Sequence, residues 1–395
     1  MEPSAWQRAA DSFLNRYNEP APLLVRAPGR INVIGEHTDY NDGFVLPIAL
    51  PYATVIAARP QSSTNAGEHA PDPAVVEVAS EGFGAATFNV AADPNSTDGW
   101  ARYVHGVASV IADWLPGSVD DVPGWQGTIA TDIPPGASLS SSAALEVAAS
   151  LVFAAFTEPR TELSVVDLAR IGQRVENDVM GLPSGLLDQL ASAGGREGHA
   201  TLIDCRTLSM RSVPFPDGAT IVVMDTGTRR ELVESEYKNR QTTCAAAATN
   251  LGLNSLRDAT IDDLERLTGT EQRRARHVIT ENARTLAAAD AMESGDLATL
   301  GQLMVASHIS LRDDYEVTGP ALNAIVEAAL ECSGCYGARM TGGGFAGGAI
   351  ALVDDEQVDR FCADLEGNYS APAEQPAVAP LRLYPTPPSA GAGYL

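Results

Sequence analysis

Short runs of β-branched and apolar residues precede a longer stretch with helical spacing. Strand-like runs occupy residues 21–60 and 76–90, and a polar, proline-containing loop is expected over 60–75. Residues 139–156 instead show the period of a helix. Its apolar positions are Leu145, Ala148, Ala149, Val152 and Phe156. The pattern predicts strands first and then a buried helix.

The second half of the chain repeats this mixture of elements. It predicts a strand at 220–224, helices over 231–250 and 271–310, a strand at 349–353 after a glycine-rich turn, and a terminal strand near 381–384. Mixed runs of this kind predict two α+β domains that meet near residues 205–215. We expect domains over residues 1–205 and 206–395, since 395 residues exceed a single domain of about 150.

Composition and charge exclude several classes of protein. The chain is 45% apolar, which is enough for a sizeable core, and carries 51 acidic against 26 basic residues, a formal net charge of −25. Such a charge repels nucleic acid and anionic membranes, so neither is expected as a partner. The only lysine is Lys238, and no glycine loop precedes it. A P-loop nucleotidase and a protein kinase both need a lysine on the phosphates, so both are excluded.

The N-terminus and the cysteines point to the cytoplasm. No signal-peptide pattern opens the chain, and no stretch approaches the roughly 18 apolar residues of a membrane span. The cysteine count of five is odd, which indicates reduced thiols. Cys332 and Cys335 have Cys-x-x-Cys spacing, but no second pair or nearby histidine completes a zinc or redox site.

The first of three motifs is GRINVIGEHTDYNDG, residues 29–43. Glu36, His37 and Asp39 offer carboxylate and imidazole groups that can bind the hydroxyls of a sugar. A polar turn closed by residues 41–43 is the alternative, because turns collect the same residue types.

The second motif is PPGASLSSSAA, residues 134–144, directly before the predicted helix. A small-residue loop entering a helix N-terminus directs unpaired N–H groups and the positive dipole end at one point, and the serine hydroxyls add donors. The motif predicts a phosphate site without lysine. A serine-capped helix is the alternative, although a cap needs one serine and not three.

The third motif is MTGGGFAGG, residues 340–348, which leads into a strand. Five glycines in seven positions indicate close approach of the backbone to a ligand or to another segment. A flexible glycine loop is the alternative.

Together these motifs resemble those of the GHMP small-molecule kinases, and the first narrows the resemblance to the galactokinase family. The sequence GLLDQ, residues 185–189, and residues 338–345 extend the match over nearly the whole chain. The resemblance implies a two-domain GHMP kinase fold, with an N-terminal domain like domain 2 of ribosomal protein S5 and a ferredoxin-like C-terminal domain. The active site would lie between them.

The resemblance also implies the catalytic pair. Asp188 matches the aspartate that faces the anomeric hydroxyl, as general base or orienting acceptor. An aspartate is too weak a base to take a sugar proton in the ground state, so proton transfer must accompany or follow P–O bond formation. Arg30 matches the arginine beside it, which would keep the carboxylate ionised and neutralise charge on the transferred phosphoryl group.

Binding residues follow from the same match. The sugar contacts would be Glu36, His37, Asp39, Gly185, Asp188 and Tyr237, whereas Asn32 would support the loop. The ATP contacts would be Trp100, Tyr103, Gly136, Ala137, Ser138, Leu139, Ser140, Ser141 and Ser142. Mg²⁺ keeps waters and uses few protein groups, and Ser142 and Glu176 match its ligands. The alternative for Trp100 and Tyr103 is packing in the core. The alternative for Glu176 is a solvated position on a helix.

The sequence departs from the family pattern in four places. Ser138 and Ala346 replace glycines, Arg230 replaces a histidine, and Ala321-Leu322-Asn323 replaces Glu-Leu-Asp. A positive φ at Ser138 would be strained and would call the affinity for phosphate into question. The tripeptide concerns packing.

The implied activity is transfer of the γ-phosphoryl group of MgATP to the anomeric hydroxyl of α-D-galactose, giving galactose 1-phosphate and ADP. A kinase for N-acetylgalactosamine or arabinose stays open, as does a non-catalytic galactose sensor, although sensors lose residues from the Ser-Ser-Ser-Ala stretch, which is whole here at residues 140–144. We expect a cytoplasmic monomer or weak dimer.

Overall fold

The computed structural model describes residues 3–61, 72–115, 121–134, 138–182, 184–229, 233–345 and 347–395. Within these residues the chain forms an eight-stranded and a four-stranded sheet, both flanked by helices. The expected α+β class is thereby confirmed. Most of the loop expected over 60–75 lies outside the described residues.

The larger sheet has a continuous path of six strands. In sheet order these are β12 (Gly393–Tyr394), β1 (Leu23–Ile34), β2 (Phe44–Pro60), β5 (Trp125–Thr131), β3 (Val75–Ser80) and β4 (Gly84–Asn89). Neighbours are antiparallel except for β3 and β5. The long strand β2 also pairs through Phe44 and Val45 with β6 (His199–Asp204), which pairs with β7 (Ser209–Pro214).

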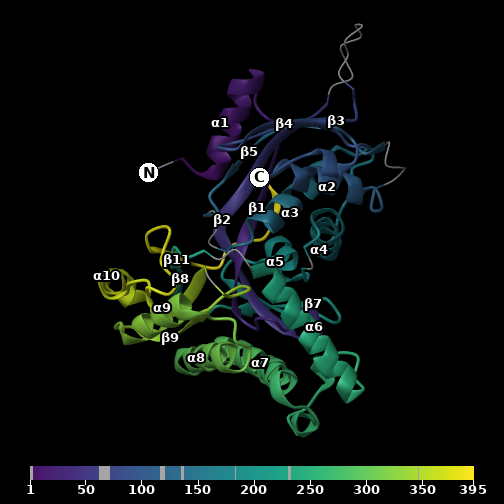
Figure 1. Cartoon of the computed structure of the whole chain (residues 1–395). Coiled ribbons are helices and arrows are strands. Elements are labelled where there is room, and N and C mark those ends of the chain that lie inside the picture. The colour runs from purple at the N-terminus through teal and green to yellow at the C-terminus, as the bar shows by residue number, and fades with distance from the viewer. Residues whose placement is uncertain are drawn as a thin grey trace.

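Helices cover both faces of this sheet. α1 (Ala5–Tyr17) buries Ala5, Ala9 and Phe13 against β2 and β5. The opposite face carries α2 (Ala101–Ile111), α3 (Ser141–Phe156), α4 (Val165–Arg174) and α5 (Leu187–Gly194), as Figure 1 shows. α3 is apolar nearly all round, which fits its burial between the sheet and the other helices.

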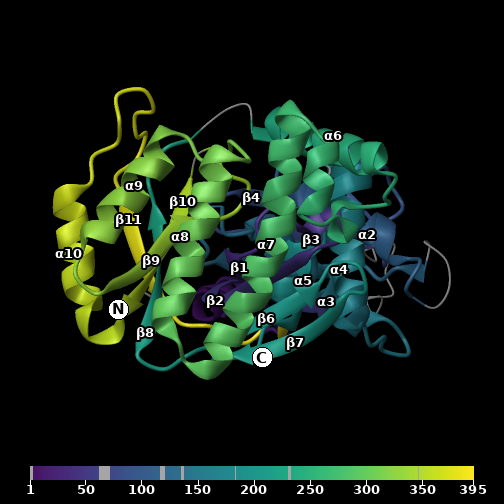
Figure 2. The same ribbon diagram turned by 90° about the horizontal axis from the view of Figure 1, so that it is seen from below.

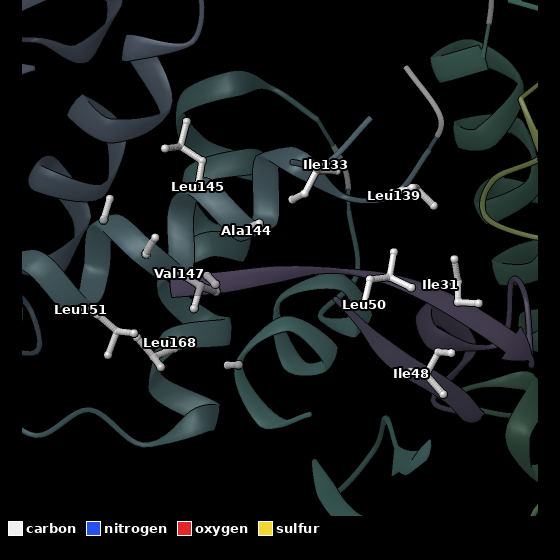
Figure 3. Close-up of a cluster of buried hydrophobic side chains, with 14 of the residues drawn as sticks. Ile31, Ile48, Leu50, Ile133, Leu139, Ala144, Leu145, Val147, Leu151 and Leu168 are labelled. Carbon is white, nitrogen blue, oxygen red and sulfur yellow. The ribbon is translucent and has the colours of Figure 1, made fainter. Parts of the chain in front are cut away.

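The hydrophobic core beneath α3 holds the segment that precedes the helix close to the larger sheet. Figure 3 shows Leu139 and Ile133 near β1 and β2, which carry Ile31, Ile48 and Leu50. All five side chains are buried, and each contributes about 1.5–3 kcal/mol to the stability of the fold. Leu139 therefore anchors residues 138–142 to the sheet.

The smaller sheet is antiparallel throughout. Its order is β11 (Arg382–Thr386), β8 (Ala219–Asp225), β10 (Gly348–Asp354) and β9 (Cys335–Met340). Figure 2 shows from below the helices of the second half of the chain, namely α6 (Val233–Leu251), α7 (Gly269–Ser294), α8 (Leu297–Asp313), α9 (Pro320–Glu331) and α10 (Val358–Asn368). Of these, α8 and α9 contact β9 of the smaller sheet, whereas α7 contacts β1, β2 and β7 of the larger one. No helix in the described part of the chain is both long and apolar enough to cross a membrane.

The short helices connect these elements. They are η1 (Asp39–Asn41), η2 (Pro94–Ser96), η4 (Val175–Met180), η5 (Leu256–Asp258), η6 (Asp262–Arg266) and η7 (Asp355–Gln357). η4 is a π-helix that continues α4, and such insertions often occur at functional sites.

The strands expected within 21–60 and 76–90, at 220–224, at 349–353 and near 381–384 are confirmed, as are the helices over 139–156 and 231–250. The single helical pattern over 271–310 is wrong in one respect. Gly295, at φ +71°, ends α7, and Asp296 then caps α8 by accepting a hydrogen bond from the N–H of Thr299. The two-residue strand β12 was not expected. The domain division at residue 205 stays a prediction, and the larger sheet extends past it to β7.

Candidate active site

The first motif forms the tight turn that follows β1. Gly35 has φ +106°, and a Cβ there would lie 2.7 Å from the carbonyl oxygen of Phe44. The Thr38 hydroxyl lies 2.8 Å from the Gly35 carbonyl oxygen and 2.7 Å from that of Phe44. These contacts close the turn so that Glu36, His37 and Asp39 all face one cavity. The polar-turn interpretation is therefore correct as local structure, and the turn also carries the side chains of a pocket.

That cavity has a volume of about 260 Å³. Every residue predicted to contact the sugar lines it, together with the predicted catalytic arginine. The remaining lining residues were not predicted as contacts: Asn32, Leu182, Ser184, Leu187, Gly342 and Gly343, with Glu176 from the predicted metal pair. We call this cavity the sugar pocket, after the ligand predicted for these residues.

Asp188 and Arg30 meet at the edge of the sugar pocket. The Arg30 Nε donates to Asp188 Oδ1 at 2.7 Å, and its Nη2 lies 2.6 Å from the same oxygen. Ser140 Oγ donates to Asp188 Oδ2 at 2.5 Å. The Arg30 side chain is 10% exposed but that of Asp188 is 31% exposed, so the carboxylate is reachable from the pocket. The second carboxylate oxygen thus connects the sugar pocket to the serine segment.

Glu36 is fully enclosed and joins the two halves of the chain. Its carboxylate forms an ion pair with Arg339, and its Oε1 accepts hydrogen bonds from the Thr341 hydroxyl and the Gly342 N–H, both at 3.1 Å. Burial raises the pKa of Glu36, and the charge of Arg339 opposes that rise. Glu36 therefore shapes the pocket wall through residues more than 300 positions away.

Arg339 is completely buried and has a second acidic partner in Glu281, at 3.9 Å. Glu281 Oε1 also accepts a hydrogen bond from the Gly35 N–H at 3.0 Å, which holds the turn itself. Burial raises the pKa of Glu281, but the nearby cations, Arg284 foremost, outweigh this and lower it to about 2. We call Glu36, Arg339, Glu281 and Arg284 the buried ion network.

Burial, followed by the negative charge of Asp188, raises the pKa of the Asp39 carboxyl to about 6. Gly185 stands directly against it, since a Cβ on Gly185 would lie 2.1 Å from Asp39 Oδ2. Gly185 thus allows the segment before α5 to approach Asp39. Its predicted contact with a sugar ring stays a prediction.

Tyr237 forms the side of the pocket that comes from α6. Its ring lies 5.4 Å from those of both His37 and Tyr40, and burial raises the pKa of its hydroxyl well above the usual value. A Cβ on Gly343 would lie 3.7 Å from the same ring. The glycine motif and α6 therefore close the pocket together.

A second, larger cavity of about 1010 Å³ lies beside the serine segment. Trp100, Tyr103, Ser141 and Ser142 line it, together with the exposed Phe83. Trp100 Nε1 donates to the Phe83 carbonyl oxygen at 3.2 Å, which fixes the indole at the cavity wall. The two predicted aromatic residues thus line a cavity as well as packing on the core.

The start of α3 has no side-chain cap within the described residues. Ser140 occupies the N-cap position, yet its hydroxyl donates to Asp188. The alternative interpretation as a serine-capped helix is therefore wrong, because the serine at the cap position has another partner. α4 shows the contrast, since Ser164 and Asp167 form a reciprocal capping box there. The first N–H groups of α3 stay available to an anion.

The backbone before α3 is strained at two serines. Ser138 has φ +60° and Ser140 has φ +59°, a region that residues other than glycine seldom adopt. The positive φ considered for Ser138 is therefore found. Its carbonyl oxygen accepts a hydrogen bond from Arg30 Nη1 at 3.0 Å, and its hydroxyl oxygen lies 2.9 Å from where a Cβ on Gly347 would be. We call residues 138–142 the serine segment.

Ser142 and Glu176 stand where the two cavities approach each other. Ser142 lines the larger cavity, Glu176 lines the sugar pocket, and Ser142 Oγ donates to Glu176 Oε1 at 3.1 Å. Burial, followed by the charge of Asp188, raises the pKa of Glu176. A buried carboxylate beside another carboxylate favours a nearby cation, and a hydroxyl and a carboxylate suit Mg²⁺. Among the described residues, no cluster of three or more His, Cys, Asp or Glu is arranged to hold a metal.

Four positions named above lie outside the described residues. They are Gly136 and Ala137 of the predicted ATP contacts, and the substituted Ala346 and Arg230. Leu139 directs its side chain into the core, and its carbonyl oxygen accepts the Arg30 N–H at 3.1 Å. Cys332 and Cys335 are free thiols.

The residues that support the pocket from a distance were not predicted. Arg339 belongs to β9 and lies within the matched residues 338–345, but no role was predicted for it. Glu281 belongs to α7 and lies far from any motif. A charged residue within the apolar run of β9 was the available signal. Asn32, expected to support its loop, does accept the Leu46 N–H at 3.2 Å, and it also lines the sugar pocket.

Comparison with known proteins agrees with this geometry. Residues 102–196 match the GHMP kinases N terminal domain and residues 288–371 the GHMP kinases C terminal model. Mevalonate kinase from Methanococcus jannaschii superposes with a TM-score of 0.65 at 15% identity, over 93% of this chain and 98% of that one, which shows a shared fold. The chain therefore has the GHMP kinase fold.

A narrower match comes from residues 11–60, which fit the galactokinase galactose-binding signature. Galactokinases of Chloroflexus aggregans and Chloroflexus aurantiacus are 43% and 41% identical, covering 91% and 97% of this chain and 91% and 95% of their own lengths. Lactococcus lactis galactokinase, solved in complex with galactose, superposes with a TM-score of 0.86 at 33% identity over 98% of both chains. The chain belongs to the galactokinase family.

Proposed function

We propose that this sugar kinase transfers the γ-phosphoryl group of ATP to the anomeric hydroxyl of α-D-galactose, giving galactose 1-phosphate and ADP. One observation supports it above others. The Asp188 carboxylate, paired with Arg30, is open to the sugar pocket on one side and bound to Ser140 of the serine segment on the other. A hydroxyl held by Asp188 would therefore face a phosphate held at the start of α3.

Asp188 would orient the reacting hydroxyl and take up its proton late. The hydroxyl proton leaves as the P–O bond forms, because only then is the sugar oxygen acidic enough for a carboxylate. Arg30 pairs with Asp188 and would offset the charge that develops on the phosphoryl oxygens. Its guanidinium contacts both Asp188 and the Ser138 carbonyl oxygen, so it cannot swing away freely.

The nucleotide would occupy the larger cavity, with its base near Trp100 and Tyr103 and its phosphates at the uncapped N-terminus of α3. Backbone N–H groups, hydroxyls and the helix dipole replace the missing lysine there. Ser142 and Glu176 would hold Mg²⁺, which neutralises phosphate charge when bound. We place the enzyme in the cytoplasm, where ATP is supplied and the five free cysteines stay reduced.

A coupled assay of ADP release over a panel of sugars tests the proposal. We expect ADP to appear with galactose and not in its absence. Faster release with N-acetylgalactosamine or arabinose would assign the enzyme to that sugar. Galactose binding with no ATP consumption would identify a sensor and refute the proposed function.

A further inference from the structure

The His37 ring separates the sugar pocket from a buried chain of hydrogen bonds. His37 Nδ1 lies 2.8 Å from the Tyr40 hydroxyl, which lies 2.8 Å from the Tyr315 hydroxyl, and Cys244 Sγ follows at 3.1 Å. Tyr40 belongs to η1, Cys244 to α6, and Tyr315 follows α8. None of the three lines the sugar pocket. Three separated segments thus converge behind a single pocket residue.

The opposite nitrogen of the ring has no such partner. His37 Nε2 is buried and has no hydrogen-bond partner within the described part of the chain, and His37 lines the pocket. Burial lowers the pKa of His37 to about 3, so the imidazole is neutral at physiological pH. A neutral imidazole carries one N–H, and the hydrogen bond at one nitrogen determines what the other nitrogen offers.

Each of these three hydrogen bonds contains one proton, so the donors in the series can all point only one way or the other. If the protons point from Cys244 toward His37, Tyr40 donates to Nδ1 and Nε2–H faces the pocket. If they point the other way, Nδ1–H donates to Tyr40 and Nε2 presents a lone pair. The first arrangement makes His37 a donor to a ligand and the second makes it an acceptor.

One observation favours the first direction. Glu36 and Asp39 line the same pocket as His37, and their carboxylates repel a lone pair and attract an N–H.

We propose that Tyr40, Tyr315 and Cys244 are positioning residues that hold His37 as the Nε2–H tautomer, so that it donates a hydrogen bond to a sugar hydroxyl. The sugar contact rests on the proposed function, whereas the tautomer does not. Several carboxylates line the pocket, and each can accept the proton of a sugar hydroxyl. The oxygen of such a hydroxyl can then accept a hydrogen bond from the N–H of His37. The three residues would thus tune sugar affinity without touching the sugar.

The tautomer is measured first, on the enzyme without ligand. The chain has six histidines, so ¹⁵N-labelled imidazole signals can be assigned with a His37→Gln variant. We expect the His37 signals of a protonated Nε2 and an unprotonated Nδ1. We expect Tyr40→Phe, which removes the donor to Nδ1, to shift the Nδ1 signal to that of a nitrogen without a hydrogen bond. A wild-type Nδ1–H tautomer overturns the proposal.

Kinetics test the consequence for binding. We expect Tyr40→Phe to raise the KM for galactose about five- to tenfold with kcat changed less than about twofold, and Tyr315→Phe to have a smaller effect in the same direction. The KM effect should vanish for the one deoxygalactose that lacks the hydroxyl bound by His37. An unchanged KM in Tyr40→Phe overturns the proposal.

Three further variants separate positioning from structure. Cys244→Ser keeps a donor and should match wild type more closely than Cys244→Ala does. Tyr369→Phe is the control, because the Tyr369 hydroxyl is buried in the C-terminal core with no partner among the described residues. A KM rise in Tyr369→Phe equal to that in Tyr40→Phe would contradict a specific role. If wild type does not phosphorylate galactose, the proposed function fails while the tautomer result still decides this inference.

Discussion

Two parts of the active site differ in their electrostatics. The residues around the sugar pocket form one wall, which we call the sugar wall, and the serine segment forms the other, which we call the phosphate wall. The sugar pocket is supported from behind by charged side chains that pair inside the protein, since Glu36 pairs with Arg339, and Glu281 with Arg284. The serine segment carries no such pairs. It offers an uncapped helix start, and its serines at φ +60° and +59° hold the backbone in a rare conformation.

This difference follows from what each wall must recognise. A neutral sugar brings no charge, so the charges that bind it must be balanced before it arrives, or burial would cost too much. A triphosphate with its cation brings charge of both signs, so the wall needs only dipoles and room. The sugar wall should therefore be rigid and sensitive to substitution. The phosphate wall should tolerate substitution, although its backbone is strained.

Asp188 belongs to both walls, and its removal should have the largest effect. We expect Asp188→Asn to reduce kcat about 10²–10⁴-fold, because the reacting hydroxyl loses its acceptor. Galactose affinity, measured by calorimetry, should stay within about fivefold of wild type, since Glu36, His37 and Asp39 keep their places. Asp188→Ala should behave alike. Wild-type turnover in either variant would contradict the role assigned to Asp188.

The buried ion network should carry the second largest effect. We expect Arg339→Met to lower the free energy of unfolding by about 3–5 kcal/mol, because Glu36 is left buried without its cation. Galactose affinity should fall at least tenfold, while ATP affinity should change little. Equilibrium denaturation and calorimetry measure both quantities.

The matched control for that variant is Arg360→Met. Arg360 is 68% exposed and pairs with Asp364 at the surface, so the free energy of unfolding should change by at most about 0.5 kcal/mol. Adding Glu36→Gln to Arg339→Met should restore part of the lost stability. An Arg339→Met protein as stable as wild type would break the comparison between the two walls.

Asp39 should show that the sugar wall trades stability for binding. Its pKa of about 6 lies above the ordinary value of 3.8, so folding favours the protonated form, and the stability that this group contributes is lost as pH rises through 6. We expect Asp39→Asn to raise the free energy of unfolding by about 1–3 kcal/mol at pH 8, with no gain below about pH 4. Denaturation at both pH values measures this.

The Asp39 carboxylate should also determine how kcat/KM for galactose decreases at acidic pH. Wild-type kcat/KM for galactose should fall below about pH 6, where Asp39 gains a proton and accepts fewer hydrogen bonds. Asp39→Asn should have a low kcat/KM without that inflection. If Asp39→Asn is less stable than wild type at pH 8, burial does not strain this carboxylate.

What sequence could predict differs between the walls for a physical reason. Residues of the turn after β1 and of the serine segment are consecutive, so local spacing already placed Glu36, His37, Asp39 and the serines. Asp188 and Arg30 needed the family resemblance, because 158 positions separate them. Arg339, Glu281 and Tyr315 reach the pocket only through the packing of β9, α7 and the end of α8. Neither period nor composition records that packing.

The fold was predictable to a similar extent. Hydrophobic runs predicted the long strands and α3, since burial on one side leaves a clear period. The break at Gly295 was missed because helical spacing continues on both sides of it, although the glycine itself was a signal. β12 pairs with β1 through Gly393 and Tyr394 only, which is too short for any period.

Ser138 provides the smallest effect and tests whether strain in the phosphate wall belongs to folding or to binding. The positive φ is present without nucleotide, so its cost should fall on stability. We expect Ser138→Gly to raise the free energy of unfolding by about 0.5–1 kcal/mol, and the KM for ATP to stay within about twofold. Ser138→Ala, which keeps a Cβ at φ +60°, should show no gain. If Ser138→Gly instead tightened ATP binding more than tenfold at unchanged stability, the segment would have to rearrange when phosphate binds, and the uncapped start of α3 would not be a preformed site.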